Sequence, residues 1–147
     1  GMGMVLSNTL YKEGKVSVSA MGAEQELDEE TAESVKIGVY IFPELHFSKL
    51  GYDLKLEGIK EVEGEMAYQL VVSKNGKQVL TNYYSVNTGL KIKMEDAMSG
   101  NAIAYKNYEE KNGILFPMLN VIASPMATIE SKVKNIEVNP DLADSDF

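Results

Sequence analysis

The chain has 147 residues, of which 44% are hydrophobic and 24% charged, as expected for one globular domain. Its formal net charge is −8 and all 14 of its basic residues are lysines, so neither a nucleic-acid site nor attachment to an anionic membrane surface is expected. The absence of cysteine excludes disulfides, thiol catalysis and cysteine-bound zinc.

The first residues predict a tag remnant and a short lead-in. Gly1 precedes Met2 as in a cleavage scar, and the start lacks the charged and apolar regions of a secretion signal. Residues 1–14 are therefore interpreted as tag remnant and lead-in, and residues 15–147 as a single β domain, a fragment of a longer protein. Its first strand is predicted over residues 15–21, which alternate with period two.

One main helix is predicted over residues 28–42. It begins at an aspartate that can cap the first turn. Val35, Val39 and Phe42 then share one face, and most of the remaining positions in this half are also apolar, which predicts a buried helix. Pro43 disfavours helical geometry at Phe42 and ends the helix.

From Gly51 onward, apolar and polar residues alternate in short runs, which predicts antiparallel strands joined by tight connections. Asn75-Gly76 and Asn112-Gly113 are signals for type I′ hairpin turns. The first turn predicts a register with three facing pairs, Val72 with Val79, Leu70 with Thr81, and Tyr68 with Tyr83.

The next connection, residues 86–89, is compatible with two registers. A four-residue loop sets Tyr83 opposite Ile92, whereas a three-residue loop sets Tyr84 there. The four-residue loop is preferred because it continues the apolar face through Ile92 and Met94.

The C-terminal strands are less regular in sequence. Pro117 cannot donate to a ladder, so its strand is predicted to end there or to lie at an edge. The last strand is predicted over residues 128–138. Its apolar residues before and after residues 134–135 would otherwise point to opposite faces, so a bulge is predicted there. The fold class predicted is α+β and mainly β: a curved antiparallel sheet, an unclosed half-barrel, packed on one main helix.

No residue pattern predicts catalysis, a metal site or a cofactor. His46 is the only histidine, so paired zinc ligands are not available, and a structural role is expected for it. Asp141, Asp144 and Asp146 lack the glycine and the closing glutamate of a calcium loop, which favours a solvated tail.

An apolar face of the sheet is the candidate functional feature. With the predicted helix above it, this face would form either a filled core or, if a gap remains, a hydrophobic pocket. The candidate cavity residues are Val35, Val39, Phe42, Tyr52, Leu54, Leu56, Tyr68, Leu70, Val72, Tyr83, Ile92 and Met94.

The order of the segments "IFPEL", "GYDLKLEGIKEVEGEMAYQLVV", "NYYSVNTGLKIKMEDA", "YKNYEEKNGILFPMLN" and "KVKNIEVNPDLADSDF" resembles the periplasmic lipoprotein-localisation carriers of Lol type. More closely, it resembles the carrier-like segment that follows the peptidase units in some insulinase-type (pitrilysin-like) zinc peptidases of Bacteroides-like bacteria. The resemblance covers roughly residues 14–147.

This resemblance implies an unclosed antiparallel β-barrel wrapped around helices that holds acyl chains. It implies a non-catalytic module of a periplasmic or cell-envelope zinc peptidase, which binds or positions hydrophobic peptide, lipid or lipoprotein segments. The peptidase domains of the same polypeptide would be its partners. The alternative is a purely structural domain with a filled core and no ligand.

This chain departs from the carriers in two ways: it has no arginine for the cavity, and the further strands before residue 15 are missing or reduced to "VLSNTLY". Fewer strands would leave a bare sheet edge, which pairs readily with another chain. A homodimer through such an edge is therefore expected.

Overall fold

The computed structural model describes residues 7–12, 15–20, 23–25, 27, 37–38 and 40–140. It divides into two units, residues 1–51 and residues 52–147, which are described separately. The prediction of a single domain over residues 15–147 stays a prediction.

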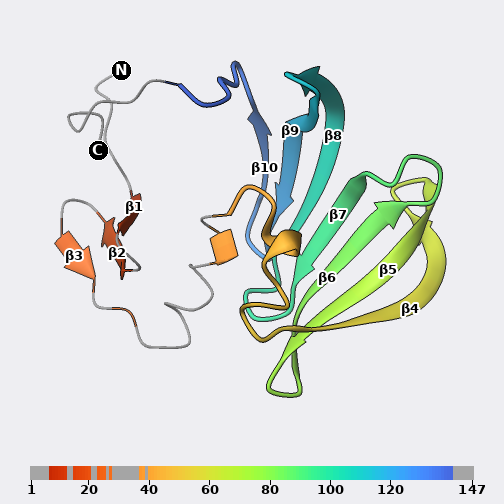
Figure 1. Cartoon of the computed structure of the whole chain (residues 1–147), viewed down its shortest axis with the longest axis horizontal. Coiled ribbons are helices and arrows are strands. Elements are labelled where there is room, and N and C mark those ends of the chain that lie inside the picture. The colour runs from red at the N-terminus through yellow and green to blue at the C-terminus, as the bar shows by residue number, and fades with distance from the viewer. Residues whose placement is uncertain are drawn as a thin grey trace. The chain divides into compact units, whose positions relative to one another are not determined.

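The first unit contains a small antiparallel sheet with the strand order β1-β2-β3 (Figure 1). Its strands are β1 (Ser7–Lys12), β2 (Lys15–Ala20) and β3 (Ala23–Gln25). β2 confirms the strand predicted over residues 15–21. β1 lies within the segment interpreted as lead-in, and it pairs with β2 along its whole length, from Ser7 opposite Ala20 to Lys12 opposite Lys15.

The helix predicted over residues 28–42 lies almost wholly outside the described residues, as do Val35 and Val39. Of this segment, the described part shows helical backbone only at residues 37–38. Phe42 is not helical, and Pro43 begins a 3-10 turn, Pro43–Leu45, instead of following a helix. A sheet packed on one main helix is therefore not supported.

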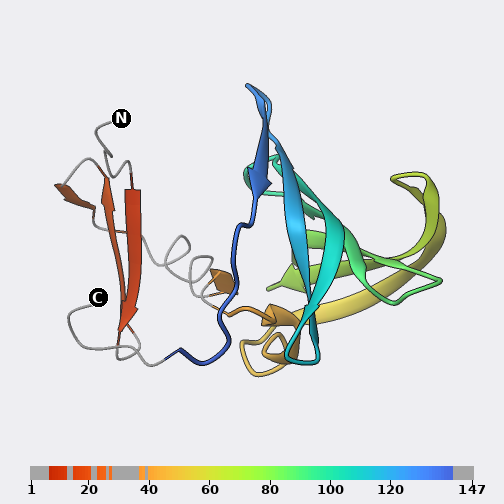
Figure 2. The ribbon, with the colours of Figure 1, turned by 90° about the horizontal axis from the view of Figure 1, so that it is seen from above.

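The second unit is a seven-stranded antiparallel sheet whose strands follow each other in chain order, β10-β9-β8-β7-β6-β5-β4. The strands are β4 (Asp53–Val62), β5 (Glu65–Lys74), β6 (Lys77–Ser85), β7 (Lys91–Asp96), β8 (Ala102–Lys111), β9 (Ile114–Ala123) and β10 (Thr128–Lys132). The sheet does not close, because β4 and β10 each pair with one neighbour only. Figures 1 and 2 show that it is bent, most strongly along β4 and β5. The predicted mainly-β, unclosed antiparallel sheet is confirmed.

Both asparagine-glycine turns form as predicted. Asn75 and Gly76 have φ angles of 52° and 75°, and Asn112 and Gly113 have 51° and 80°. Type I′ turns need positive φ at both central positions, and their twist matches that of the flanking strands. The β5–β6 and β8–β9 hairpins therefore start from turns that the local sequence specifies.

The register predicted for the β5–β6 hairpin is wrong beyond the turn. Lys74 pairs with Lys77 as expected, but Val72 pairs with Leu80 and Leu70 with Asn82. A β-bulge leaves Val79 as an extra residue between Gln78 and Leu80. One extra residue exchanges the faces of all residues that follow it along β6.

The four-residue loop between β6 and β7 is confirmed, since the Ser85 amide bonds to the Leu90 carbonyl at 2.8 Å and encloses residues 86–89. A second bulge nevertheless changes the pairing that follows. Tyr84 faces Lys91 and Tyr83 faces Lys93, so Ile92 is the extra residue.

β9 continues through Pro117, so the first predicted alternative, a strand that ends there, is wrong, and the second, a proline at an edge, is confirmed. Pro117 faces Tyr108 of β8, while β10 pairs with β9 only as far as Lys132 opposite Leu119. Pro117 thus lies beyond the end of β10, where β9 needs no donor on that side. β10 itself stops at Lys132, so the predicted strand to residue 138 and its bulge are also wrong.

Replacing Gly76 with alanine should lower the free energy of unfolding by about 1 kcal/mol, because a Cβ is disfavoured at a φ of 75°. Urea unfolding followed by circular dichroism measures the change. The matched control is Lys77→Ala, at an exposed position of the same hairpin. Equal losses in the two variants would contradict a turn that depends on its glycine.

Candidate binding surface

One row of side chains runs across the whole seven-stranded sheet. Directly paired residues of antiparallel strands point to the same face, so the strand pairing connects one residue of each strand. The row is Leu56, Leu70, Asn82, Met94, Ile103, Ile122 and Ile129. The face that carries this row is called the aliphatic face. The seven side chains of this row are hydrophobic except for one asparagine.

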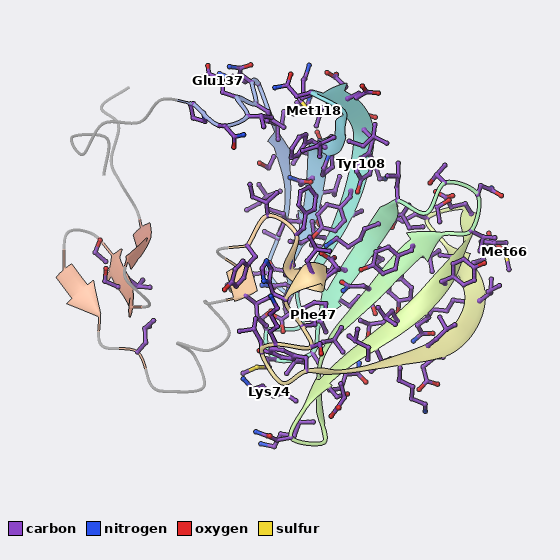
Figure 3. All side chains as sticks on the ribbon, viewed as in Figure 1. Phe47, Met66, Lys74, Tyr108, Met118 and Glu137 are labelled. Atoms are coloured by element: carbon purple, nitrogen blue, oxygen red, sulfur yellow. The ribbon has the colours of Figure 1, made fainter. Side chains whose placement is uncertain are left out.

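The aliphatic face is partly open to solvent along β4 and β5. Five of its side chains keep between 39% and 60% of their surface exposed: Leu54, Leu56, Ile59, Met66 and Tyr68. These five residues are called the outer patch. Ile59 faces Tyr68 across the β4–β5 pair, and Met66, labelled in Figure 3, belongs to the same face by alternation along β5. A contiguous group of exposed apolar side chains indicates an interaction surface rather than scattered exposure.

The asparagine in the row is buried without a partner for its oxygen. Asn82 is 2% exposed, and its Oδ1 atom has no hydrogen-bond partner. Asn120 also has a buried, unpartnered Oδ1, and it lies two residues from Ile122 on the same face of β9. A buried acceptor without a donor costs free energy, so these two amides are unusual positions on this face.

The opposite face carries a polar cluster around Tyr83. The Tyr83 hydroxyl donates to Glu95 at 2.8 Å, and the Lys93 ammonium donates to the same carboxylate at 2.8 Å. The ammonium of Lys60 lies 4.9 Å from the centre of the Tyr83 ring, a cation–π distance. We call this side of the sheet the tyrosine face.

Burial and hydrogen bonding change the ionisation of this cluster. Burial, with the bond to Glu95, raises the pKa of Tyr83 to about 12. For Glu95, burial opposes ionisation, but the hydrogen bonds from Lys93 and Tyr83 outweigh it and lower the pKa of the carboxyl. The cluster is therefore a neutral tyrosine beside an ion pair at physiological pH, which suits a structural role.

The tyrosine face also holds the buried hydrophobic cluster of the sheet. Tyr83, 2% exposed, packs there with Val62, Ala67 and Ile92. An ion pair between Lys106 and Glu63, at 3.1 Å, links β8 to the turn between β4 and β5. This side of the sheet is thus held by its own packing and charges and leaves no comparable group of exposed apolar residues.

The predicted cavity residues are divided among several places. The aliphatic face brings together Leu54, Leu56, Tyr68, Leu70, Val72 and Met94. Tyr83 and Ile92 belong instead to the cluster on the tyrosine face, because the bulges at Val79 and Ile92 exchanged their sides. Tyr52 is buried under the ammonium of Lys74, and Phe42 lies in the first unit.

Sequence reasoning missed several members of the aliphatic face. Five residues of this face were not among the predicted cavity residues. They are Ile59 and Met66 in the outer patch, and Ile103, Ile122 and Ile129 in the row. Alternation along β8 and β9 could have identified the isoleucines once the pairing was known. The asparagines carry no sequence signal, because their significance comes from what surrounds them.

The structural role predicted for His46 stays a prediction, and the structure shows one aromatic contact of its ring. Its ring stacks on Tyr40 with the ring centres 3.9 Å apart. Among residues 40–140 and the shorter described stretches, no three His, Cys, Asp or Glu side chains come together as a metal site would require. Asp141, Asp144 and Asp146 lie outside the described residues. In the same described stretches, no helix has the length and apolar character to span a membrane.

Comparison with known proteins identifies the fold. No model of a known protein family matches the chain, and no curated protein matches it in sequence. Among solved structures, a LolA superfamily protein from Nitrosomonas europaea superposes with a TM-score of 0.51 at 15% identity, over 88% of this chain and 66% of that one. A DUF1329 family protein from Desulfovibrio piger gives 0.46 at 17% identity, over 76% and 52%. This chain has a LolA-like fold and spans about half to two thirds of the length of these proteins.

Replacing Asn82 with leucine should raise the free energy of unfolding by about 1 kcal/mol, because it removes an unpartnered acceptor from an aliphatic row. Thermal and urea unfolding measure the gain. Asn87→Leu, at an exposed position of the β6–β7 loop, is the control that should show no gain. A less stable Asn82→Leu protein would mean that the side chain is satisfied in solution.

Raising the pH from 10 to 12 should destabilise the protein by about 2 kcal/mol through Tyr83 alone. In the folded state Tyr83 keeps its proton up to about pH 12, whereas in the unfolded state it loses the proton near pH 10. Raising the pH therefore stabilises the unfolded state relative to the folded state. Thermal unfolding of the wild type and of Tyr83→Phe at pH 9 and at pH 11.5 gives the difference. If both proteins lose the same stability, Tyr83 does not carry the effect.

Proposed function

We propose that this chain is a non-catalytic, lipoprotein-carrier-like module that binds or positions hydrophobic peptide, lipid or lipoprotein segments. The outer patch is the observation that carries the proposal, because five apolar side chains on one face of β4 and β5 remain 39% to 60% exposed. Covering a largely exposed leucine contributes about 1 kcal/mol or more to binding. The LolA-like fold supports the proposal, because it agrees with the resemblance of the sequence to the Lol-type carriers.

The division of the sheet into two faces favours the aliphatic face as the binding side. The tyrosine face keeps its lysines and glutamates in internal pairs, as in Lys93–Glu95 and Lys106–Glu63. The aliphatic face offers hydrocarbon surface with no charged residue in the row that crosses it. Hydrophobic segments would therefore gain contact area along this row without removing water from a charge.

The resemblance seen in the sequence extends the proposal to the parent protein. The module would belong to a zinc peptidase polypeptide of the periplasm or cell envelope and would contact its peptidase domains. The reading frame upstream of Val5 tests this extension. An inverse zinc motif, H-x-x-E-H, is expected there, and a reading frame without any peptidase motif would refute the extension.

Binding of a fluorescent dodecanoyl probe tests the function of this chain itself. The wild type should show saturable binding, and Leu56→Lys should weaken it by about fivefold or more, because a charge replaces the most exposed leucine of the outer patch. Fluorescence titration measures both dissociation constants.

Thr128→Lys is the matched control, since it adds the same charge at an exposed position on the opposite face at the far edge of the sheet. It should bind the probe as the wild type does. If the wild type binds neither the acyl probe nor a hydrophobic peptide, the chain is a purely structural domain and the proposed function fails.

A further inference from the structure

The aliphatic face contains two acceptors that a hydrocarbon chain cannot satisfy. Asn82 stands in the row between Leu70 and Met94, and its Oδ1 atom is buried and without a donor. The side chains that pair with it across the sheet are aliphatic, so they supply no hydrogen. Pairing this oxygen therefore requires an N–H or O–H group from outside the row.

The second acceptor lies well away from the first on the same face. Asn120 is on β9, and the strands β7 and β8 separate it from β6, which carries Asn82. Three strand spacings of about 4.8 Å put the two strands roughly 14 Å apart. Met94 and Ile103 continue the row from Asn82 to Ile122, and Asn120 stands two residues from Ile122, opposite Tyr105. From β6 to β9, the face thus presents one acceptor, then hydrocarbon side chains, and then a second acceptor.

From this pattern we infer that the preferred ligand of the aliphatic face is an apolar peptide in extended conformation, with backbone N–H groups donating to Asn82 and Asn120. The inference rests on the proposed function and narrows its ligand class. An acyl chain carries donors only at its head group, so it reaches one of the two oxygens at most. An extended peptide carries an N–H about every 3.3 Å and places apolar side chains between them.

A flexible side chain lies directly beside Asn82. Met94 is the direct cross-strand neighbour of Asn82 and is only half-buried. Methionine is unbranched and changes conformation easily, so rotation of Met94 can make room beside the amide. The outer patch continues the same face through Leu70 to Leu56, where further apolar residues of the peptide would lie.

The test compares three fluorescent probes on the full chain: an acetylated heptapeptide of alternating leucine and serine, the same peptide N-methylated at alternate residues, and a dodecanoyl chain. N-methylation removes donors while it keeps the side chains. For the wild type, the parent peptide should bind about three to ten times more tightly than its N-methylated form, as expected for one or two hydrogen bonds.

Asn82→Leu and Asn87→Leu are the protein variants. Asn82→Leu should bind both peptides with nearly equal affinity, because the acceptor is lost. Asn87→Leu should retain the wild-type preference. Unfolding curves establish that both variants are folded.

The outcomes separate this inference from the proposed function. If the dodecanoyl chain binds while N-methylation changes nothing, or if Asn82→Leu keeps the wild-type preference, the peptide inference is overturned and the hydrophobic binding function stands. If no probe binds, both are overturned.

Discussion

The pairing register of the seven-stranded sheet is the constraint on which every other feature depends. Side chains alternate between faces with a period of two, so one extra residue moves all later residues of a strand to the other side. Bulges at Glu57, Val79 and Ile92 introduce such residues into β4, β6 and β7. They gather aliphatic side chains on one face and place Tyr83 on the other. The two faces consequently differ in chemistry as well as in position.

The two faces satisfy their polar groups in different ways. On the tyrosine face, Tyr83, Glu95 and Lys93 pair with one another, and burial is matched by hydrogen bonds. On the aliphatic face, Asn82 and Asn120 keep buried oxygens without donors, beside side chains that stay partly exposed. Binding a partner lowers the free energy of a surface that has exposed apolar side chains and buried acceptors without donors. A surface whose polar groups already pair with one another gains little from binding.

Much of the sheet could be predicted because its signals are local. Asn75-Gly76 and Asn112-Gly113 form hairpins because their backbone angles suit few other residues, and period-two alternation located most strands of the second unit. The candidate surface was predicted less well. Leu54, Leu56, Tyr68, Leu70, Val72 and Met94 share a face as expected, but Tyr83 and Ile92 do not. A bulge depends on how neighbouring strands twist and pack, so no single residue type predicts its position.

The sequence by itself determined the turns, the antiparallel order and the absence of a recognisable catalytic motif, because each follows from residues adjacent in the chain. Only the tertiary structure decided which side chains share a face, that β9 runs through Pro117, and that Asn82 sits unpaired among aliphatic neighbours. These properties arise between strands that are distant in sequence. Burial and hydrogen-bond satisfaction are relations among such strands, so they exist only once the sheet has formed.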